Sequence, residues 1–246
     1  SDIRLHPVFA TDFVRSMAQT PPKSTESDAD PRRHAPATLR NRDAILAILP
    51  QAFGSALQIL EIASGTGEHA AHCAPALAKA AKGGFIWYPS DWDAENLPGI
   101  DAHAKAAMAD SGQPGCIAPA QRIDVSQADW TPQWTQPGQA GPIEAIFCAN
   151  MIHIAPWAAA EGLFSGAGRL LPRNGTLTLY GPYRRNGQHT APSNAGFDAS
   201  LQSRDPSWGV RDLEGEVAPL AQCNGLSLHR IETMPANNLI VIFRKD

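Results

Sequence analysis

Cysteine is scarce in this chain, and its distribution lacks the usual pattern of a structural zinc site. The cysteines Cys73, Cys116, Cys148 and Cys223 lie far apart, and none forms a C-x-x-C pair. Structural zinc sites are commonly built from such pairs, and secreted domains use closely spaced cysteines for disulfides. We therefore expect reduced thiols, no metal site and a cytoplasmic location.

Long basic runs and long apolar runs are also missing. The chain has 20 lysine and arginine residues against 24 aspartate and glutamate residues, which gives a formal net charge of −4. Nucleic acid is therefore not expected as a partner. No apolar segment reaches the length of a transmembrane helix, and the N-terminus shows no signal-peptide pattern, so no membrane association is expected. Hydrophobic residues make up 43% of the 246 residues, enough for the core of one large or two small domains.

A glycine-broken turn follows the first strongly apolar segment. The pattern predicts a strand over Leu57–Ile62, a tight loop, and a helix over His69–Lys82. Gly65 and Gly67 permit positive φ and let a ligand approach the backbone. The first N–H groups of the following helix have no partner within the helix and can bind polar ligand atoms.

This loop fits two cofactors and also a turn without a ligand. Gly65-x-Gly67-x-x-Ala70 matches the dinucleotide pattern G-x-G-x-x-G/A, which by itself is a weak signal. Glu61 favours the other cofactor, because a carboxylate repels a pyrophosphate, whereas S-adenosylmethionine carries an ammonium and a sulfonium. The stretch resembles motif I of class I S-adenosylmethionine-dependent methyltransferases, E-x-x-x-G-x-G. The remaining alternative is a simple strand-to-helix turn of any α/β protein.

The remaining apolar segments alternate between strand and helix patterns. Such alternation predicts a parallel sheet with helices on both faces. The loop MPANN joins the last two expected strands as a hairpin, so the last strand must be antiparallel. Expected strands are 57–62, 85–88, 121–125, 142–150, 175–180, 226–233 and 238–244, and expected helices are 38–49, 69–82, 96–110, 158–171, 194–204 and 212–223. The prediction is therefore an α/β, Rossmann-like class I methyltransferase fold with a seven-stranded, mostly parallel sheet and an antiparallel last strand.

The first forty residues do not read as part of this sheet. Phe9, Phe13 and Met17 share one face of a short expected helix, and a polar, proline-rich loop follows. The segment is either a flexible leader or a lid over the cofactor. We therefore expect an extension over residues 1–40 and a methyltransferase domain over residues 41–246.

Polar residues at the strand ends form the expected cofactor site, because ligands of open α/β sheets bind beyond the carboxyl ends of the strands. Asp91 is the expected ribose ligand, and Trp92 is placed beside the adenine. The alternative role for Asp91 is a helix cap, but Asp93 can serve as that cap. The expected cofactor-binding residues are Glu61, Ala63, Ser64, Gly65, Thr66, Gly67, Asp91, Trp92, Asp124, Val125 and Asn150.

The expected acceptor side begins past the fourth strand. His153 is the predicted general base, since its unperturbed pKa near 6.5 lets it take a proton at neutral pH; a structural histidine under the loop is the alternative. Tyr183 is the second predicted catalytic residue. Adjacent arginines in its loop suggest an anionic acceptor, or else only a solvated basic loop. The expected acceptor-binding residues are Asn41, Arg42, Arg184, Gln188 and His189. His69 and His72 have the spacing of a metal pair, but no third ligand is near in sequence.

Four stretches resemble one uncharacterised family of class I methyltransferase-like proteins, described only by a domain-of-unknown-function label. They are LEIASGTGEHA, ANMIHIAPW, LYGPYRRNGQHTAPSNAGFDASLQSRDPSWGVRDL and MPANNL. The resemblance runs from about Thr38 to the C-terminus. It implies the fold and binding of S-adenosylmethionine, with S-adenosylhomocysteine as the product, but it supplies no substrate.

Two functions of different classes are compatible with these patterns. The first is an S-adenosylmethionine-dependent methyltransferase acting on a small molecule, for example one with a carboxylate or another anionic group. The second is a non-catalytic module on the same fold that binds S-adenosylmethionine or a partner. The polar loop 183–194 favours the enzyme. A dehydrogenase is disfavoured by Glu61 and by the closing hairpin.

Overall fold

The computed structural model describes residues 30–132 and 142–246. Residues Pro31–Asp246 form one compact unit. The expected lid helix through Phe9, Phe13 and Met17 lies outside the described residues. Of the extension expected over residues 1–40, the described part includes Pro36–Arg40, which form the first turns of a helix.

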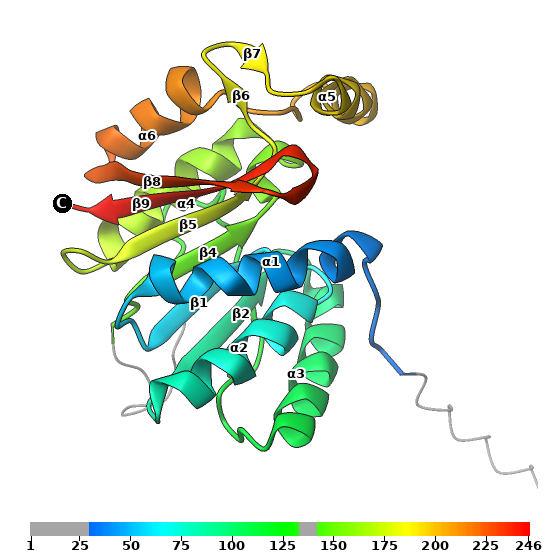
Figure 1. Ribbon diagram of the computed structural model, residues 1–246, viewed down its shortest axis with the longest axis vertical. Helices are drawn as coiled ribbons and strands as arrows, with labels where there is room; N and C mark the ends of the chain where they lie inside the picture. Colours follow the sequence, from blue (N-terminus) through cyan, green and yellow to red (C-terminus); the bar gives the residue numbers. More distant parts are fainter. Residues whose placement is uncertain (1–29, 133–141) are drawn as a thin grey trace, which may run out of the picture. The chain divides into compact units, whose positions relative to one another are not determined.

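A seven-stranded sheet forms the centre of this unit (Figure 1). Its strands are β1 (Gln58–Ile62), β2 (Ile86–Asp91), β3 (Gln121–Arg122), β4 (Ala145–Ala149), β5 (Thr176–Gly181), β8 (Leu226–Met234) and β9 (Asn238–Lys245). The spatial order is β3-β2-β1-β4-β5-β9-β8. Strands β1 to β5 are parallel, and β9 runs antiparallel to both β5 and β8. This arrangement confirms the predicted fold class, including the antiparallel last strand.

Helices cover both faces of the sheet, as expected for parallel strands whose connections are helical. They are α1 (Pro36–Phe53), α2 (Glu68–Ala81), α3 (Leu97–Ser111), α4 (Trp157–Leu170), α5 (Pro192–Arg204) and α6 (Ala218–Cys223). Ile59 and Phe147 pack toward α1 and α2, whereas their neighbours Leu60 and Ile146 pack toward α4. Because side chains alternate across a strand, each strand supplies both hydrophobic cores.

Short irregular elements complete the fold around the ends of the strands. They are 3-10 turns at Ala94–Asn96, Met151–His153 and Pro235–Asn237, a π turn at Leu213–Val217, and a small hairpin of β6 (Arg184–Arg185) and β7 (Gln188–His189). Compared with the prediction, β3 is shorter, the expected helix 212–223 starts as the π turn, and the loop after β5 contains the hairpin. None of the helices in the described part of the chain is long and apolar enough to cross a membrane.

Gly166 on α4 leaves room for Trp130, which packs into the core between α4 and the sheet. The Trp130 indole N–H donates to the carbonyl of Gly162 over 2.8 Å. A Cβ on Gly166 would clash with the same indole ring. Trp130 is buried here against the core between α4 and the sheet. Close approach of the ring therefore depends on the missing side chain at Gly166.

We expect Gly166→Ala to lower the free energy of unfolding by about 1–3 kcal/mol, because an added methyl group overpacks a filled core. Gly196→Ala on α5 is the matched control, since a Cβ there meets no atom within 4 Å. That change should stabilise the protein by roughly 0.5–1 kcal/mol through helix propensity. Urea unfolding of both variants measures the difference, and equal effects would contradict the packing of Trp130.

Candidate functional site

A cavity of about 520 Å³ lies at the carboxyl ends of β1, β2 and β4. Six of the predicted cofactor residues line it: Ala63, Gly65, Asp91, Trp92, Asp124 and Val125. Further lining residues were not predicted from the sequence, among them Asn96, Ser126, Met151, Ile154, Pro156 and Trp208. Several of these belong to the stretch ANMIHIAPW, in which only Asn150 and His153 were predicted as site residues. The volume falls in the range of small-molecule and cofactor sites.

The glycine loop is fastened to the end of β2. Backbone N–H of Ser64 donates to the carbonyl of Ser90 over 2.8 Å, and N–H of Gly65 donates to Asp91 Oδ2 over 2.8 Å. The hydroxyl oxygen of Ser64 also accepts from the N–H of Ser90 over 3.1 Å. Bonds within the protein therefore hold two residues of the cavity wall, Gly65 and Asp91, in place.

The two loop glycines have different roles. Both have positive φ, +59° at Gly65 and +83° at Gly67. A Cβ on Gly65 would meet no atom within 4 Å, whereas a Cβ on Gly67 would lie 2.8 Å from Cα of Ile100. Gly65 therefore leaves room at the cavity wall, and Gly67 permits close packing of the loop on α3. Only Gly65 fits the predicted role in ligand approach.

Asp91 is more heavily engaged than the sequence suggested. Its Oδ1 accepts from the N–H of Asp93 and from the Asn96 side-chain amide, both over 3.0 Å, in addition to the Gly65 bond at Oδ2. Asp93 does cap the following turn, through the N–H of Glu95. Since an ionised carboxylate can accept about four hydrogen bonds, Asp91 keeps capacity for one more donor from the cavity.

Part of the cavity wall is apolar and exposed to solvent. Trp92 and Ile154 line it and are 63% and 43% exposed, respectively, although both are large apolar side chains. Asp124 lies at the same end of the cavity, where the hydroxyl of Ser126 holds the pKa of its carboxyl below the ordinary value. An ionised acid and exposed aromatic surface therefore face one space.

Glu61 does not reach the cavity. Its Oε2 accepts from the Ser64 hydroxyl over 2.8 Å and from the Trp87 indole N–H over 3.0 Å. Burial raises the pKa of Glu61 to about 7. The predicted contact with a ligand ammonium is replaced by support of the loop from below, because the side chain points toward the α1 and α2 face of the sheet.

Four other predicted cofactor residues also lie off the cavity wall: Ser64, Thr66, Gly67 and Asn150. Thr66 donates its hydroxyl to Glu68 Oε2 over 2.8 Å. Asn150 adopts φ of +63° at the end of β4, and its N–H donates to the carbonyl of Tyr180 over 2.7 Å. The contacts of Thr66 and Asn150 are therefore with other parts of the protein and not with the cavity.

His153 is entirely buried, and its environment does not fit the predicted general base. Its Nδ1 accepts the backbone N–H of Arg211 over 3.3 Å, so the neutral ring carries its proton on Nε2. Burial, with the Arg211 charge, lowers the pKa of His153 to about 3. Nε2 points toward Gly181 and has no partner among the described residues. In this state the ring is a donor, because neither nitrogen is available to take a proton.

Tyr183, the second predicted catalytic residue, is also completely buried. Its ring packs edge-on against His153, with 4.9 Å between the ring centroids. Burial raises the pKa of Tyr183, so its hydroxyl stays protonated. The structure brings the two predicted catalytic residues together, but neither of them lines the cavity.

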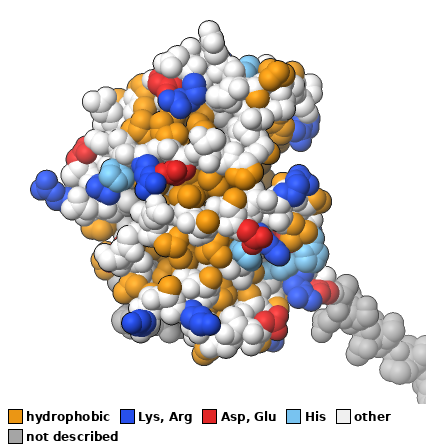
Figure 2. All heavy atoms as spheres, in the orientation of Figure 1, with side chains coloured by type: hydrophobic (Ala, Val, Ile, Leu, Met, Phe, Trp, Pro, Cys, Tyr) orange, Lys and Arg blue, Asp and Glu red, His pale blue; other side chains and the backbone are white. Residues whose placement is uncertain are grey.

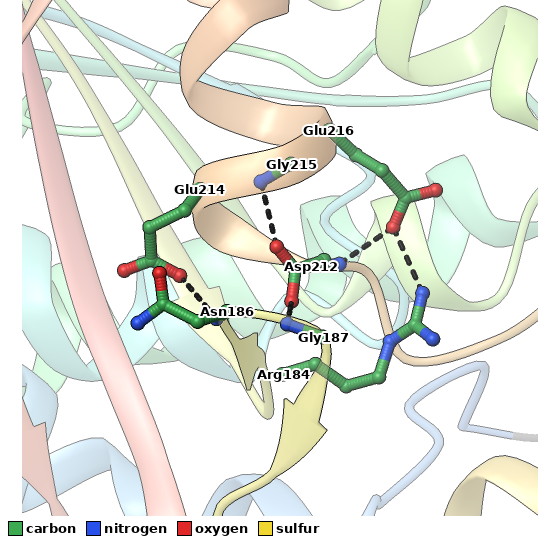
Figure 3. A pocket seen from close by; sticks show the side chains of 7 residues that line it. All are labelled: Arg184, Asn186, Gly187, Asp212, Glu214, Gly215 and Glu216. Atoms are coloured by element: carbon green, nitrogen blue, oxygen red, sulfur yellow. Dashed lines mark hydrogen bonds and ion pairs between the residues drawn. The ribbon is translucent and has the colours of Figure 1, made fainter.

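Acids from the π turn pair with both predicted arginines, and Figure 3 shows the pair of Arg184 with Glu216. Arg184 pairs with Glu216 over 3.1 Å, and Arg185 pairs with Glu214 over 2.5 Å. Asp212 accepts from the backbone N–H groups of Gly187 and Gly215. These residues surround a separate hollow of about 430 Å³. These ion pairs and hydrogen bonds fasten the hairpin to the π turn, although the buried Nε of Arg184 has no partner among the described residues.

The other predicted acceptor residues lie away from the 520 Å³ cavity, and two of them, His189 and Asn41, are bound to other side chains. His189 pairs with Asp198 over 3.2 Å, and Gln188 is exposed on the hairpin. Asn41 is buried and contacts His69, with 2.9 Å between Oδ1 and Nε2. Arg42 lines a small hollow of about 210 Å³ between the helices. None of the four lines the 520 Å³ cavity.

Strand order, the glycine loop and the acids at the ends of β2 and β3 define a Rossmann-like, class I methyltransferase fold. The chain belongs to the family described as "Protein of unknown function (DUF938)", whose model matches residues 32–245. This membership confirms the resemblance noted in the sequence.

Several solved structures similar to this chain are described as methyltransferases. An O-methyltransferase family protein from Burkholderia thailandensis has a TM-score of 0.63 and 14% identity, over 85% of this chain and 57% of that chain. Human N-acetylserotonin methyltransferase in complex with SAM has a TM-score of 0.62 and 11% identity, over 85% of this chain and 52% of that chain. Magnesium protoporphyrin IX methyltransferase from Synechocystis PCC 6803 with bound SAH has a TM-score of 0.56 and 15% identity, over 83% of this chain and 81% of that chain. The chain spans little more than half of the first two, and identities this low show the fold alone.

Glu61 should make the stability of the protein fall as pH rises. Its pKa is about 7 in the folded state against 4.5 ordinarily, so the folded state holds the proton more tightly. This proton contributes to the free energy of unfolding fully below pH 4.5, and the contribution is lost as the pH rises to about 7. The contribution is at most on the order of 3 kcal/mol. Glu61→Gln should flatten this decline in urea unfolding between pH 5 and pH 8. Glu161→Gln, an exposed control on α4, should keep the wild-type slope; a steep slope that persists in Glu61→Gln would contradict the assignment.

Proposed function

We propose that the protein binds S-adenosylmethionine in the 520 Å³ cavity and transfers its methyl group to a small molecule. The observation that carries this proposal is the composition of the cavity wall. A glycine with open space at its Cβ position, a carboxylate with spare acceptor capacity and an exposed tryptophan face one space. These are the features that an adenosine with a charged amino-acid arm requires.

The adenosine part is proposed to lie between the ends of β2 and β3. Asp91 would accept a ribose hydroxyl at the lone pair left after its three protein bonds. Trp92 and Ile154 supply apolar surface for a planar base, and Asp124 can accept from an exocyclic amino group. The amino-acid arm would pass Gly65, where a side chain would block it.

S-adenosylmethionine supplies a methyl group on a sulfonium, which is already an activated leaving group. The protein's contribution is then mainly to hold the acceptor in line and to exclude water. Positioning of this kind can contribute on the order of 7–11 kcal/mol. Proton removal by His153 is not part of the proposal, because its ring is already a neutral donor in the interior.

The acceptor is proposed to be a small molecule that enters beside the apolar rim formed with Met151, Pro156 and Trp208. The preference for an anionic acceptor stays a prediction from sequence. Its proposed ligands, Arg184 and Arg185, are paired with acids, so an anion would have to displace Glu216 or Glu214. A screen of labelled S-adenosylmethionine with carboxylates, phenols, thiols and amines identifies the class. Binding without turnover on any of them would favour the non-catalytic module.

Gly65→Asn should abolish cofactor binding while the fold is kept. Asparagine tolerates positive φ better than most residues, and its side chain would enter the open space beside the loop. We expect more than a tenfold loss of S-adenosylhomocysteine affinity, about 1.4 kcal/mol or more, by calorimetry. Gly112→Asn at the end of α3, also at positive φ with open space, is the control and should bind normally. If folded Gly65→Asn binds S-adenosylhomocysteine normally, the cofactor does not bind in this cavity beside Gly65.

Asp91→Ala should weaken binding of S-adenosylhomocysteine by about 1.5–3 kcal/mol, the usual contribution of a hydrogen bond to a charged group. Asp93→Ala removes a neighbouring carboxylate that only caps a turn, and its affinity should change less than threefold. Asn96→Ala removes one of the bonds that hold Asp91 without removing the carboxylate. If Asn96→Ala weakens binding as much as Asp91→Ala, Asp91 orders the loop and is not the ribose ligand.

A further inference from the structure

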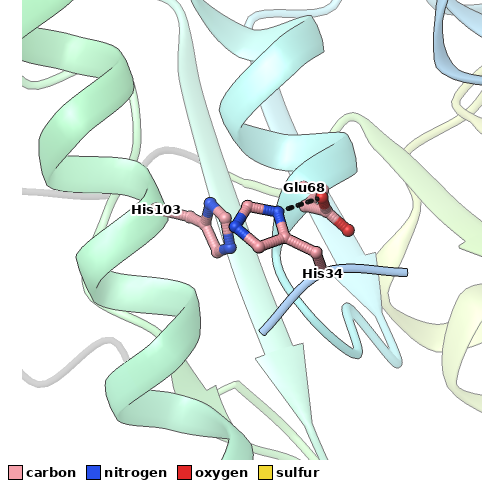
Figure 4. A group of neighbouring side chains, drawn as sticks. All are labelled: His34, Glu68 and His103. Atoms are coloured by element: carbon pink, nitrogen blue, oxygen red, sulfur yellow. Dashed lines mark hydrogen bonds and ion pairs between the residues drawn. The ribbon is translucent and has the colours of Figure 1, made fainter. Parts of the chain in front are cut away.

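A histidine-rich cluster lies on the helical side of the molecule, outside the proposed cofactor cavity. It consists of His34, just before α1, Glu68, the first residue of α2, and His103 on α3 (Figure 4). One possible ligand atom from each residue lies within 4.8 Å of the others. On the face drawn in Figure 2, one larger group of histidine side chains is visible, and other histidines lie apart from it. Three sequence-distant elements therefore bring metal-binding side chains to one point.

The hydrogen bonds leave a suitable lone pair on His103. Its Nε2 lies 2.9 Å from the carbonyl oxygen of Arg33, and a carbonyl can only accept, so Nε2 carries the proton. Nδ1 is then the atom with a free lone pair. Metal-binding histidines commonly donate their other ring N–H to a backbone carbonyl in this way, which fixes the tautomer and the ring orientation.

Glu68 and His34 are arranged to share a proton or a cation. Glu68 Oε2 accepts from the N–H of Ala35 and from the Thr66 hydroxyl, both over 2.8 Å. Glu68 Oε1 lies 2.9 Å from Nδ1 of His34. Ligand atoms around a tetrahedral zinc ion are about 3.4 Å apart, given bond lengths near 2.1 Å. The pair thus needs little movement to hold an ion.

We propose that His34, Glu68 and His103 bind a divalent transition metal ion, with Zn²⁺ as the best match. Two imidazoles and one carboxylate are a donor set typical of zinc, whereas Mg²⁺ and Ca²⁺ prefer oxygen ligands. The ion takes the place of the proton between His34 and Glu68. A neutral His34 keeps its proton by moving it to Nε2, so no proton acceptor is needed. Water completes the coordination, since the His34 side chain is 66% exposed and gives access from solvent.

Other charged groups near the site limit the affinity but leave the donors in place. Arg42 and His72 line the same small hollow as the cluster. His72 is engaged with Asp43 over 2.8 Å, so it does not compete for the ion in this arrangement. Repulsion from the Arg42 guanidinium should make the site weaker than a structural zinc site with the same ligand count.

The proposed ion would fasten the segment before α1 to α2 and α3. Arg33 in this segment also donates to Asn96, which in turn donates to Asp91 at the cofactor cavity. The carbonyl of Pro31 lies close to Gly99 of α3. The proposed ion would therefore hold in place a segment that contacts Asn96 of the cavity wall. Metal binding itself does not depend on the proposed methyltransferase function.

The test is calorimetric titration of chelator-treated protein with Zn²⁺. Wild type should bind about one zinc ion per chain, and His34→Ala and His103→Ala should each bind at least tenfold more weakly. His229→Ala, which removes a histidine on β8 remote from the cluster in sequence, should bind as wild type does. Mg²⁺ and Ca²⁺ should give no saturable binding. Circular dichroism of each variant confirms the fold, and His34→Ala is the safer variant because His34 is mostly exposed.

A second readout keeps the proposal testable if His103→Ala does not fold. Zn²⁺ should raise the melting temperature of wild type and of His229→Ala, because the ion binds the folded state. It should not raise the melting temperature of His34→Ala. The metal proposal would be overturned if wild type showed no saturable zinc binding, or if wild type and His34→Ala bound zinc equally. The three residues would then serve only to hold the segment before α1 by hydrogen bonds.

Discussion

The hydrogen bond from Gly65 N–H to Asp91 is the contact on which the candidate site depends. It ties the glycine loop to the end of the neighbouring strand, and the Ser64–Ser90 backbone bond reinforces it. Glu61 supports the same loop from the buried side through the Ser64 hydroxyl. Because these bonds are satisfied within the protein, the cavity is formed before any ligand binds, which lowers the entropy cost of binding.

The two ends of the sheet's carboxyl edge differ in character. Beside β2 and β3, the cavity exposes Trp92 and the carboxylate of Asp124. Beside β5, His153 and Tyr183 are buried and the arginines of the hairpin are paired with acids. The first region has exposed groups available to bind a ligand, whereas the second is closed to solvent around His153 and Tyr183 and holds its arginines in ion pairs. Catalysis in such a site would depend on placement of the acceptor more than on a charged base.

Local patterns allowed much of the fold to be predicted but not every boundary. The apolar pattern predicts the first helix over 38–49, yet α1 continues to Phe53 with Pro50 inside it, although a proline disfavours the helical conformation of the residue before it. Burial of Ala52 and Phe53 against the sheet outweighs the proline signal. The pattern predicts a strand over residues 121–125, but only Gln121 and Arg122 pair with β2. The extent of pairing depends on the position of the neighbouring strand, which the pattern of this segment does not specify.

The sequence by itself determined the order of strands and helices, the antiparallel closing hairpin, the glycine loop and the acids at the strand ends, because these depend on the period of apolar residues and on backbone freedom. Tertiary structure alone decided what the polar side chains face. It turned Glu61 inward, fixed the tautomer of His153 through Arg211, and paired Arg184 with Glu216. It also assembled His34, Glu68 and His103. The physical reason is that burial, charge pairing and hydrogen-bond partners come from residues distant in the chain, which no local pattern specifies.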